Sequence, residues 1–134
     1  MIAPESLLIG AGLLHFLQIP STSHLARTLL HLGPDLAKLS PLNGRIVRIF
    51  VAAASLLIFG LGLTVVCRAR EIADTPLGQA LCLLMTVFWT ARASAQLWLR
   101  RVWPKQAWAN FWYFALLTIY VTLAVSYASA LLIA

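Results

Sequence analysis

The sequence predicts an all-α integral membrane protein, a four-helix transmembrane bundle made of one domain over residues 1–134. Two observations indicate this class. The chain is 61% hydrophobic and only 10% charged, with a mean hydropathy of +0.87, which is more apolar surface than a soluble domain of this length can bury. Several apolar runs also approach the roughly 20 residues that a helix needs to cross a bilayer. Because lipid offers no hydrogen bonds to an open backbone, these runs are predicted to be helices.

The first span is predicted as a kinked helix over residues 4–32. Its uninterrupted apolar run, residues 7–19, is short for a full crossing. Pro20 removes a backbone donor and should end or kink the helix there. A new helical piece capped by Ser21 would then continue to Gly33 and Pro34. The sequence leaves open whether residues 21–32 complete the crossing or lie at the membrane surface.

A polar connection with Pro34, Pro41 and Gly44 is predicted to lead into the second span, residues 45–67. Arg45 and Arg48 mark the entry of this span. Small residues allow helices to approach closely in lipid, where packing drives association. The second span carries such residues at Ala52, Ala53, Ala54, Ser55, Gly60 and Gly62.

The third span is predicted over residues 75–101, after a short polar loop. Asp74 or Thr75 can cap this helix, and Pro76 fits its first turn. Pro104 should stop it and begin the turn into the last span, residues 106–134. Aromatic residues are enriched at membrane interfaces, and the last span opens with Trp108, Phe111, Trp112 and Tyr113.

The basic residues predict the orientation. The side that holds the first and third connections carries eight bases, and the other side carries two, Arg68 and Arg70. Treating Arg92 as intramembrane leaves seven against two. Short cytoplasmic loops are enriched in Lys and Arg, so both termini are predicted to face away from the cytoplasm of a bacterial inner membrane. The eight are Arg27, Lys38, Arg45, Arg48, Arg92, Arg100, Arg101 and Lys105.

A polar stripe on the third span is the most distinctive candidate site. Met85, Trp89, Arg92 and Gln96 recur at i, i+4, i+7 and i+11, on one face of a helix. Arg92 lies about eight residues inside the Arg100 boundary, hence roughly 12 Å deep. The four acids of the chain are all in termini or loops, so no carboxylate within a span can neutralise it. They are Glu5, Asp35, Glu71 and Asp74.

Arg92 has two interpretations. It can pair with an anionic lipid headgroup, a small anion such as a carboxylate substrate, or a partner subunit, together with Gln96 and Trp89 and with Arg45 and Arg48 at the cytoplasmic mouth of the site. Alternatively, its side chain extends to the near interface, or bonds to backbone carbonyls. The same absence of an embedded carboxylate argues against proton-coupled export.

The histidines and cysteines do not predict a cofactor or metal site. Haem ligation by two histidines needs opposing helices, and all three histidines precede the second span. His24 and His31 share one helical face. His15 lies within the first span, where we expect a neutral ring bonded to a backbone carbonyl, although pairing with a second copy would allow a cofactor. A disulfide between Cys67 and Cys82 is geometrically possible, but two free thiols are the expected state.

The sequence places no catalytic set at a usable spacing and no basic face typical of nucleic-acid binding. We therefore predict an accessory or interaction protein that packs with itself or with another membrane protein. The alternative is lipid or small-anion binding or transport through the Arg92 stripe. In either case the third span is expected to pack through its small residues, Thr90, Ala91, Ser94 and Ala95.

Two stretches carry a resemblance to known sequences. LSPLNGRI at the entry of the second span and FWTARASAQLW in the third resemble an uncharacterised group of small bacterial four-helix membrane proteins. The two stretches cover a small part of the chain. The resemblance implies the same architecture, and it implies no activity.

Overall fold

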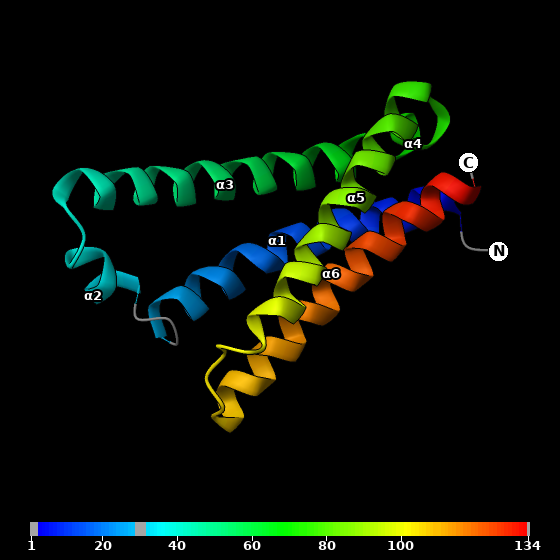
Figure 1. The fold of residues 1–134 in the computed structure, drawn as a ribbon. Coiled ribbons are helices and arrows are strands. Elements are labelled where there is room, and N and C mark those ends of the chain that lie inside the picture. Colours follow the sequence, from blue (N-terminus) through cyan, green and yellow to red (C-terminus); the bar gives the residue numbers. More distant parts are fainter. Residues whose placement is uncertain (1–2, 29–31, 134) are drawn as a thin grey trace.

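The computed structural model describes residues 3–28 and 32–133, without the side chains of residues 22, 23, 25–28, 32 and 33. Every regular element in this described part is a helix (Figure 1). Three of the helices, α3, α5 and α6, are long and apolar enough to cross a membrane. The fold is therefore all-α, as predicted, with three candidate spans. The helices are α1 (Pro4–Thr28), α2 (Leu32–Ala37), α3 (Pro41–Cys67), α4 (Ala69–Asp74), α5 (Pro76–Leu99) and α6 (Ala107–Ile133).

Helix α1 corrects the prediction for the first span at Ser21. It continues through Pro20, which lies inside the helix, so Ser21 is not a cap. Instead, the Ser21 hydroxyl donates to the Leu17 carbonyl one turn earlier, at 2.8 Å. The described part of α1 reaches Thr28; residues 29–31 lie outside the described residues, so the predicted bound at residue 32 stays a prediction. Although α1 has 25 residues, it is not among the three candidate spans, and polar residues such as His15 lower its hydropathy.

The connection that follows is more helical than predicted. Gly33 and Pro34 do not end a helix but lie in the first turn of α2. A proline fits there because the first backbone N–H groups of a helix have no intrahelical partner. The exposed side chains of Asp35, in α2, and Lys38, just after its last residue, form an ion pair at 2.9 Å.

Helix α3 begins four residues before the predicted span. Ser40 caps it by accepting a hydrogen bond from the Asn43 amide at 3.3 Å, and Pro41 occupies the first turn. Pro41 and Gly44 therefore belong to the helix rather than to the connection, and Arg45 lies in its second turn. The Ser40 cap, which was not predicted from the sequence, sets the start of α3.

The link between α3 and α5 is also helical, where a loop was predicted. Ion pairs along α4 span one turn, Arg68 to Glu71 at 3.0 Å and Arg70 to Asp74 at 3.6 Å. All four side chains are largely exposed, so each pair contributes little, about 0.3–0.5 kcal/mol for a helical pair.

The predicted start of α5 is confirmed. The Thr75 hydroxyl accepts a hydrogen bond from the Gly78 amide at 3.1 Å, and Pro76 occupies the first turn. Gly78 also lets α4 and α5 approach closely, because a Cβ at this position would overlap the backbone of Ile72. The two helices therefore meet backbone to backbone.

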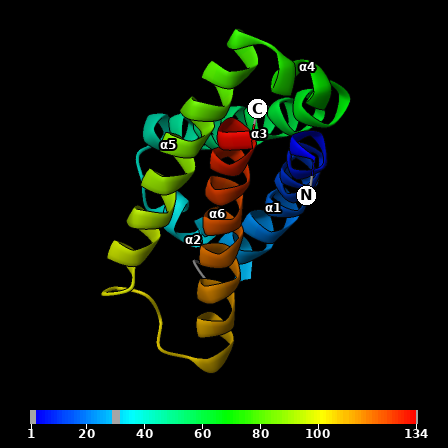
Figure 2. The same ribbon diagram turned by 90° about the vertical axis from the view of Figure 1, so that its right-hand side faces the viewer.

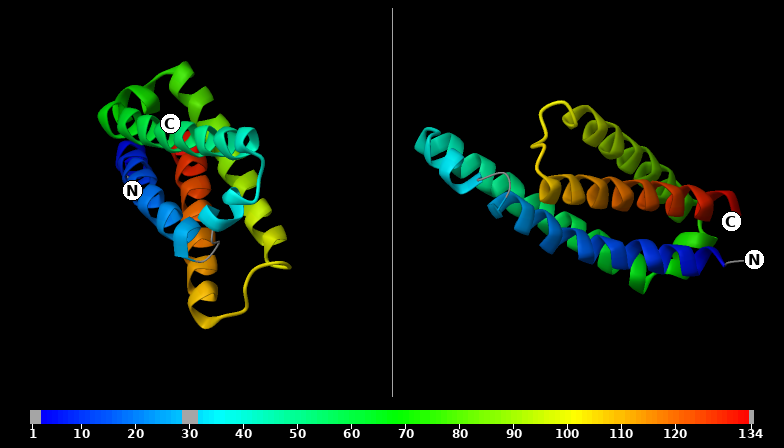
Figure 3. Two further views of the ribbon diagram at one scale, coloured as in Figure 1. Left: turned by 90° about the vertical axis from the view of Figure 1, so that its left-hand side faces the viewer. Right: turned by 90° about the horizontal axis from the view of Figure 1, so that it is seen from below.

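The long helices form two antiparallel pairs, α1 with α3 and α5 with α6, and the contact between α1 and α6 joins the pairs. Helix α3 is not among the helices that pack extensively on α5. Figures 1 and 2 show α3 diverging from α5 after the α4 link, and Figure 3 shows α3 beside α1. The arrangement is a splayed V with α4 at its apex, so a closed four-helix bundle is not confirmed.

Candidate functional site

The polar stripe of α5 faces the interior of the protein. Met85, Trp89 and Gln96 are buried, and Arg92 is half-buried at the edge of the same face. Helices α6 and α1 cover this face: Trp89 stacks on Tyr120 of α6, with ring centroids 5.7 Å apart, and its edge meets the His15 ring of α1 at 5.3 Å. The periodicity seen in the sequence therefore marks a packing surface.

Arg92 lies over the face of the Tyr120 ring, with its guanidinium carbon 4.6 Å from the ring centroid. A cation over an aromatic face gains about 0.5–2 kcal/mol, more when both groups are desolvated. The ion pairs of the described part all lie in α2 and around α4, so the partner that the structure gives Arg92 is aromatic. The sequence indicated lipid, anions and carbonyls as partners of Arg92, but not a tyrosine.

Trp89 and Gln96 are each only 1% exposed, so neither can reach a ligand at the protein surface. Within the described part, Trp89 Nε1 and Gln96 Nε2 have no hydrogen-bond partner. These side chains line the core below Arg92 instead of extending the site around it.

Arg45 and Arg48 lie elsewhere. Both are exposed on the first turns of α3, where with α2 they line a shallow hollow of about 250 Å³. Since α3 diverges from α5, the structure does not join this hollow to Arg92. An anion or lipid site on Arg92, Gln96, Trp89, Arg45 and Arg48 stays a prediction, and its five members occupy separate environments.

His15 is completely buried, and its Nδ1 donates to the Ala11 carbonyl at 2.7 Å. This is the bond to a backbone carbonyl that the sequence predicted. The rings of Trp89 and Tyr127, at 5.3 and 6.0 Å, cover the imidazole. These rings separate His15 from the protein surface, and a cofactor held between His15 and a second copy stays a prediction.

The remaining candidate ligands are dispersed. His24 packs against Trp108 and Trp112, with centroids 5.9 and 5.8 Å away, while His31 lies outside the described residues. Cys67 is exposed, Cys82 is buried, and the two are not linked. The described residues contain no group of three metal-binding side chains.

Sequence reasoning missed the tyrosines of α6. Tyr113, Tyr120 and Tyr127 are all buried and recur every seven residues, so they lie on one face of α6. The Tyr120 ring packs on α5, whereas the Tyr113 ring meets Trp103 and the Tyr127 ring meets His15 of α1. Tyr113 is thus a core residue, although it was expected to be an interface anchor. The regular seven-residue spacing could have identified this face.

The outward face of α5 also differs from expectation. Thr90, Ala91, Ser94 and Ala95 were predicted to be the packing surface, yet all four are exposed. The reason is that the aromatic groups of α6 fill the interior against large residues such as Trp89. The Ser94 hydroxyl donates to the Thr90 carbonyl at 2.9 Å within the helix. Small side chains therefore cover this part of the outer surface.

No protein-family model, no curated protein and no solved structure matches this chain. The resemblance to small bacterial four-helix membrane proteins accordingly stays a prediction.

Proposed function

We propose that the chain is a four-span protein of a bacterial inner membrane that acts as an accessory protein by associating with a second copy of itself. Helices α3, α5 and α6 supply three crossings. Helix α1 supplies the fourth, because it packs along both α3 and α6 and its sequence has no charged residue between Glu5 and Arg27.

The distribution of charge supports an orientation with both termini outside the cytoplasm. The start of α1 and the end of α6 lie near α4 (Figure 1). This end carries Arg68 and Arg70, which are paired with acids. The opposite ends of the helices carry the larger group of bases, among them Arg45, Arg48 and Arg100. An excess of bases favours the cytoplasmic side.

The native cysteines test this orientation. Cys67, the last residue of α3, is exposed at the α4 end, whereas Cys82 is buried. In spheroplasts that express the chain, a membrane-impermeant maleimide should label Cys67 without permeabilisation. Cys67→Ser should abolish the labelling, because Cys82 is covered. Labelling that requires permeabilised membranes would reverse the orientation.

The observation that carries the proposed association is the outward face of α5, defined by Thr90, Ala91, Ser94 and Ala95. In lipid, small residues on a helix surface permit close approach of another helix. This face carries no charge, so a copy placed against it meets no electrostatic repulsion. A two-fold contact puts the same patch on both partners, and matching small surfaces suit that symmetry.

A pair of matched substitutions tests the association. Ser94→Leu adds bulk to the outward face of α5, and we expect it to weaken the dimer roughly tenfold, since overpacking costs about 1–3 kcal/mol. The control is Thr122→Leu, a similar change at an exposed position of α6. The dimer fraction is measured by single-molecule photobleaching in vesicles at decreasing protein density. A wild-type chain that stays monomeric at every density, or equal dimerisation of both variants, contradicts the proposal.

A further inference from the structure

We propose that the groove between α3, α4 and α5 binds one acyl chain of a zwitterionic phospholipid from the leaflet at the α4 end. This site is separate from the outward face of α5 and does not rest on the proposed association. The groove has a volume of about 710 Å³, within the range of roughly 300–1,000 Å³ that is typical of small-molecule sites.

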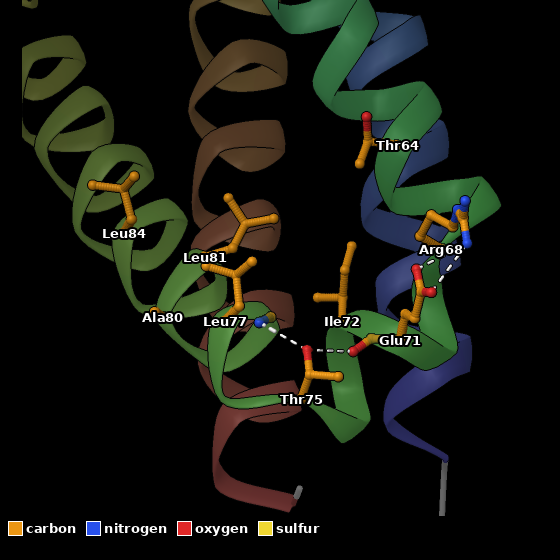
Figure 4. A pocket seen from close by; sticks show the side chains of 10 residues that line it. Thr64, Arg68, Glu71, Ile72, Thr75, Leu77, Ala80, Leu81 and Leu84 are labelled. Carbon is orange, nitrogen blue, oxygen red and sulfur yellow. Dashed lines mark hydrogen bonds and ion pairs between the residues drawn. The ribbon is translucent and has the colours of Figure 1, made fainter.

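The walls of the groove are apolar on the inside and polar at the membrane boundary. Figure 4 shows Leu77 and Leu81 of α5 facing Ile72 of α4 across the gap, with Leu84 one turn further along α5. Arg68 and Glu71 lie at the α4 edge. A phospholipid has the same gradient, from a charged headgroup at the surface to a hydrocarbon chain at depth.

The shape of the groove favours a thin occupant over a helix. Its closed end is the junction of α4 and α5, where the backbones of Ile72 and Gly78 meet. From this junction α3 and α5 diverge (Figures 1 and 4), so the groove is narrowest beside α4 and widens away from it. A transmembrane helix is about 10–12 Å wide along its whole length and cannot follow this taper, whereas a flexible acyl chain can.

Arg68 and Glu71 form the charged edge of the groove, which we call its mouth, and their charges select the headgroup. Glu71 accepts two hydrogen bonds from Nη1 of Arg68, at 3.0 and 3.1 Å, and both side chains are more than 60% exposed. A guanidinium has five N–H donors, so Arg68 can also contact a phosphate while Glu71 faces an ammonium group. The Thr75 hydroxyl is engaged internally, because it donates to the Glu71 carbonyl and accepts from Gly78. A headgroup with one charge of each sign therefore complements the mouth.

Photocrosslinking tests the site. The full chain is reconstituted into phosphatidylcholine vesicles that contain a phosphatidylcholine with a diazirine in its acyl chain, and labelled peptides are mapped by mass spectrometry. We expect labelling of the segment 77–84 to exceed that of the exposed α6 residues Val121 and Val125. Ala80→Trp, which fills the groove from an exposed wall position, should lower this labelling about fivefold, a change of roughly 1 kcal/mol. Leu83→Trp, on another face of α5, should leave it unchanged.

A second variant tests the headgroup. Glu71→Gln removes the negative charge at the mouth and should shift labelling toward a phosphatidylglycerol probe at the expense of phosphatidylcholine. Equal labelling of the groove and the exposed α6 face would show ordinary surrounding lipid and overturn the proposal, as would unchanged labelling in Ala80→Trp with a native helix content. Crosslinks between two copies across the groove would also overturn it. Ser94→Leu should not change the labelling, which separates this site from the proposed association.

Discussion

Replacing Gly62 with leucine is expected to separate α1 from α3 and to lower the free energy of unfolding by about 3 kcal/mol, the upper part of the usual range for overpacking. A Cβ at Gly62 would lie 2.9 Å from the His15 Cβ and 3.1 Å from the Gly12 carbonyl oxygen. At the opposing Gly12, an added Cβ would lie 2.6 Å from a Val66 methyl group. Neither helix can yield without moving its backbone.

The control for this variant is Gly60→Leu on the same helix. A Cβ at Gly60 meets nothing within 4 Å, so the change should stay within about 0.5 kcal/mol, as at most surface positions. Both free energies can be measured by titrating SDS into detergent micelles while following helix content. If the two variants lose the same stability, the contact between Gly12 and Gly62 does not hold α1 against α3.

Trp89→Ala is expected to be the most damaging truncation in the core, at about 3–5 kcal/mol. Trp89 is 1% exposed and contacts groups from three directions: His15 of α1, Tyr120 of α6 and Phe88 beside it. Its removal leaves a cavity where α1, α5 and α6 meet, and it uncovers the His15 ring.

Trp98→Ala provides the matched comparison, because Trp98 lies on the same helix but is 70% exposed. Its loss should change the free energy of unfolding by about 0.5 kcal/mol at most. The same SDS titration applies, supported by the near-ultraviolet circular dichroism of the aromatic cluster. A small effect of Trp89→Ala would mean that α5 does not pack on α1 through this residue.

The positions of the long helices could be predicted from the sequence, because stretches of apolar residues with Thr75 and Pro76 at one start are local features. The short helices α2 and α4 could not, since their polar sequences resemble loops and their ends depend on caps and contacts. Pro20 was expected to end or kink α1, and the helix continues through it, because one missing donor does not outweigh packing along the full length.

The candidate site was predicted only in part. The spacing of Trp89, Arg92 and Gln96 identified one face of α5, but not what covers it. In lipid, residues that face a neighbouring helix and residues that face hydrocarbon are both apolar, so hydropathy does not separate them. For this reason the small residues around Ser94 were assigned to the inside, and the tyrosines that occupy that place, such as Tyr120, were overlooked.

The order of the helices along the chain has a consequence for biogenesis. Ribosomes complete α1 and α3 before α5 and α6, and the early pair cannot shield the side of α1 that carries His15, because Trp89 and Tyr127 belong to the later pair. Until α5 and α6 have been made and have packed on α1, that imidazole lacks these two covering rings. Within the α1–α3 hairpin, the hydrogen bond to the Ala11 carbonyl, which lies in the same helix, is therefore the contact that can hold the His15 ring before the second pair arrives.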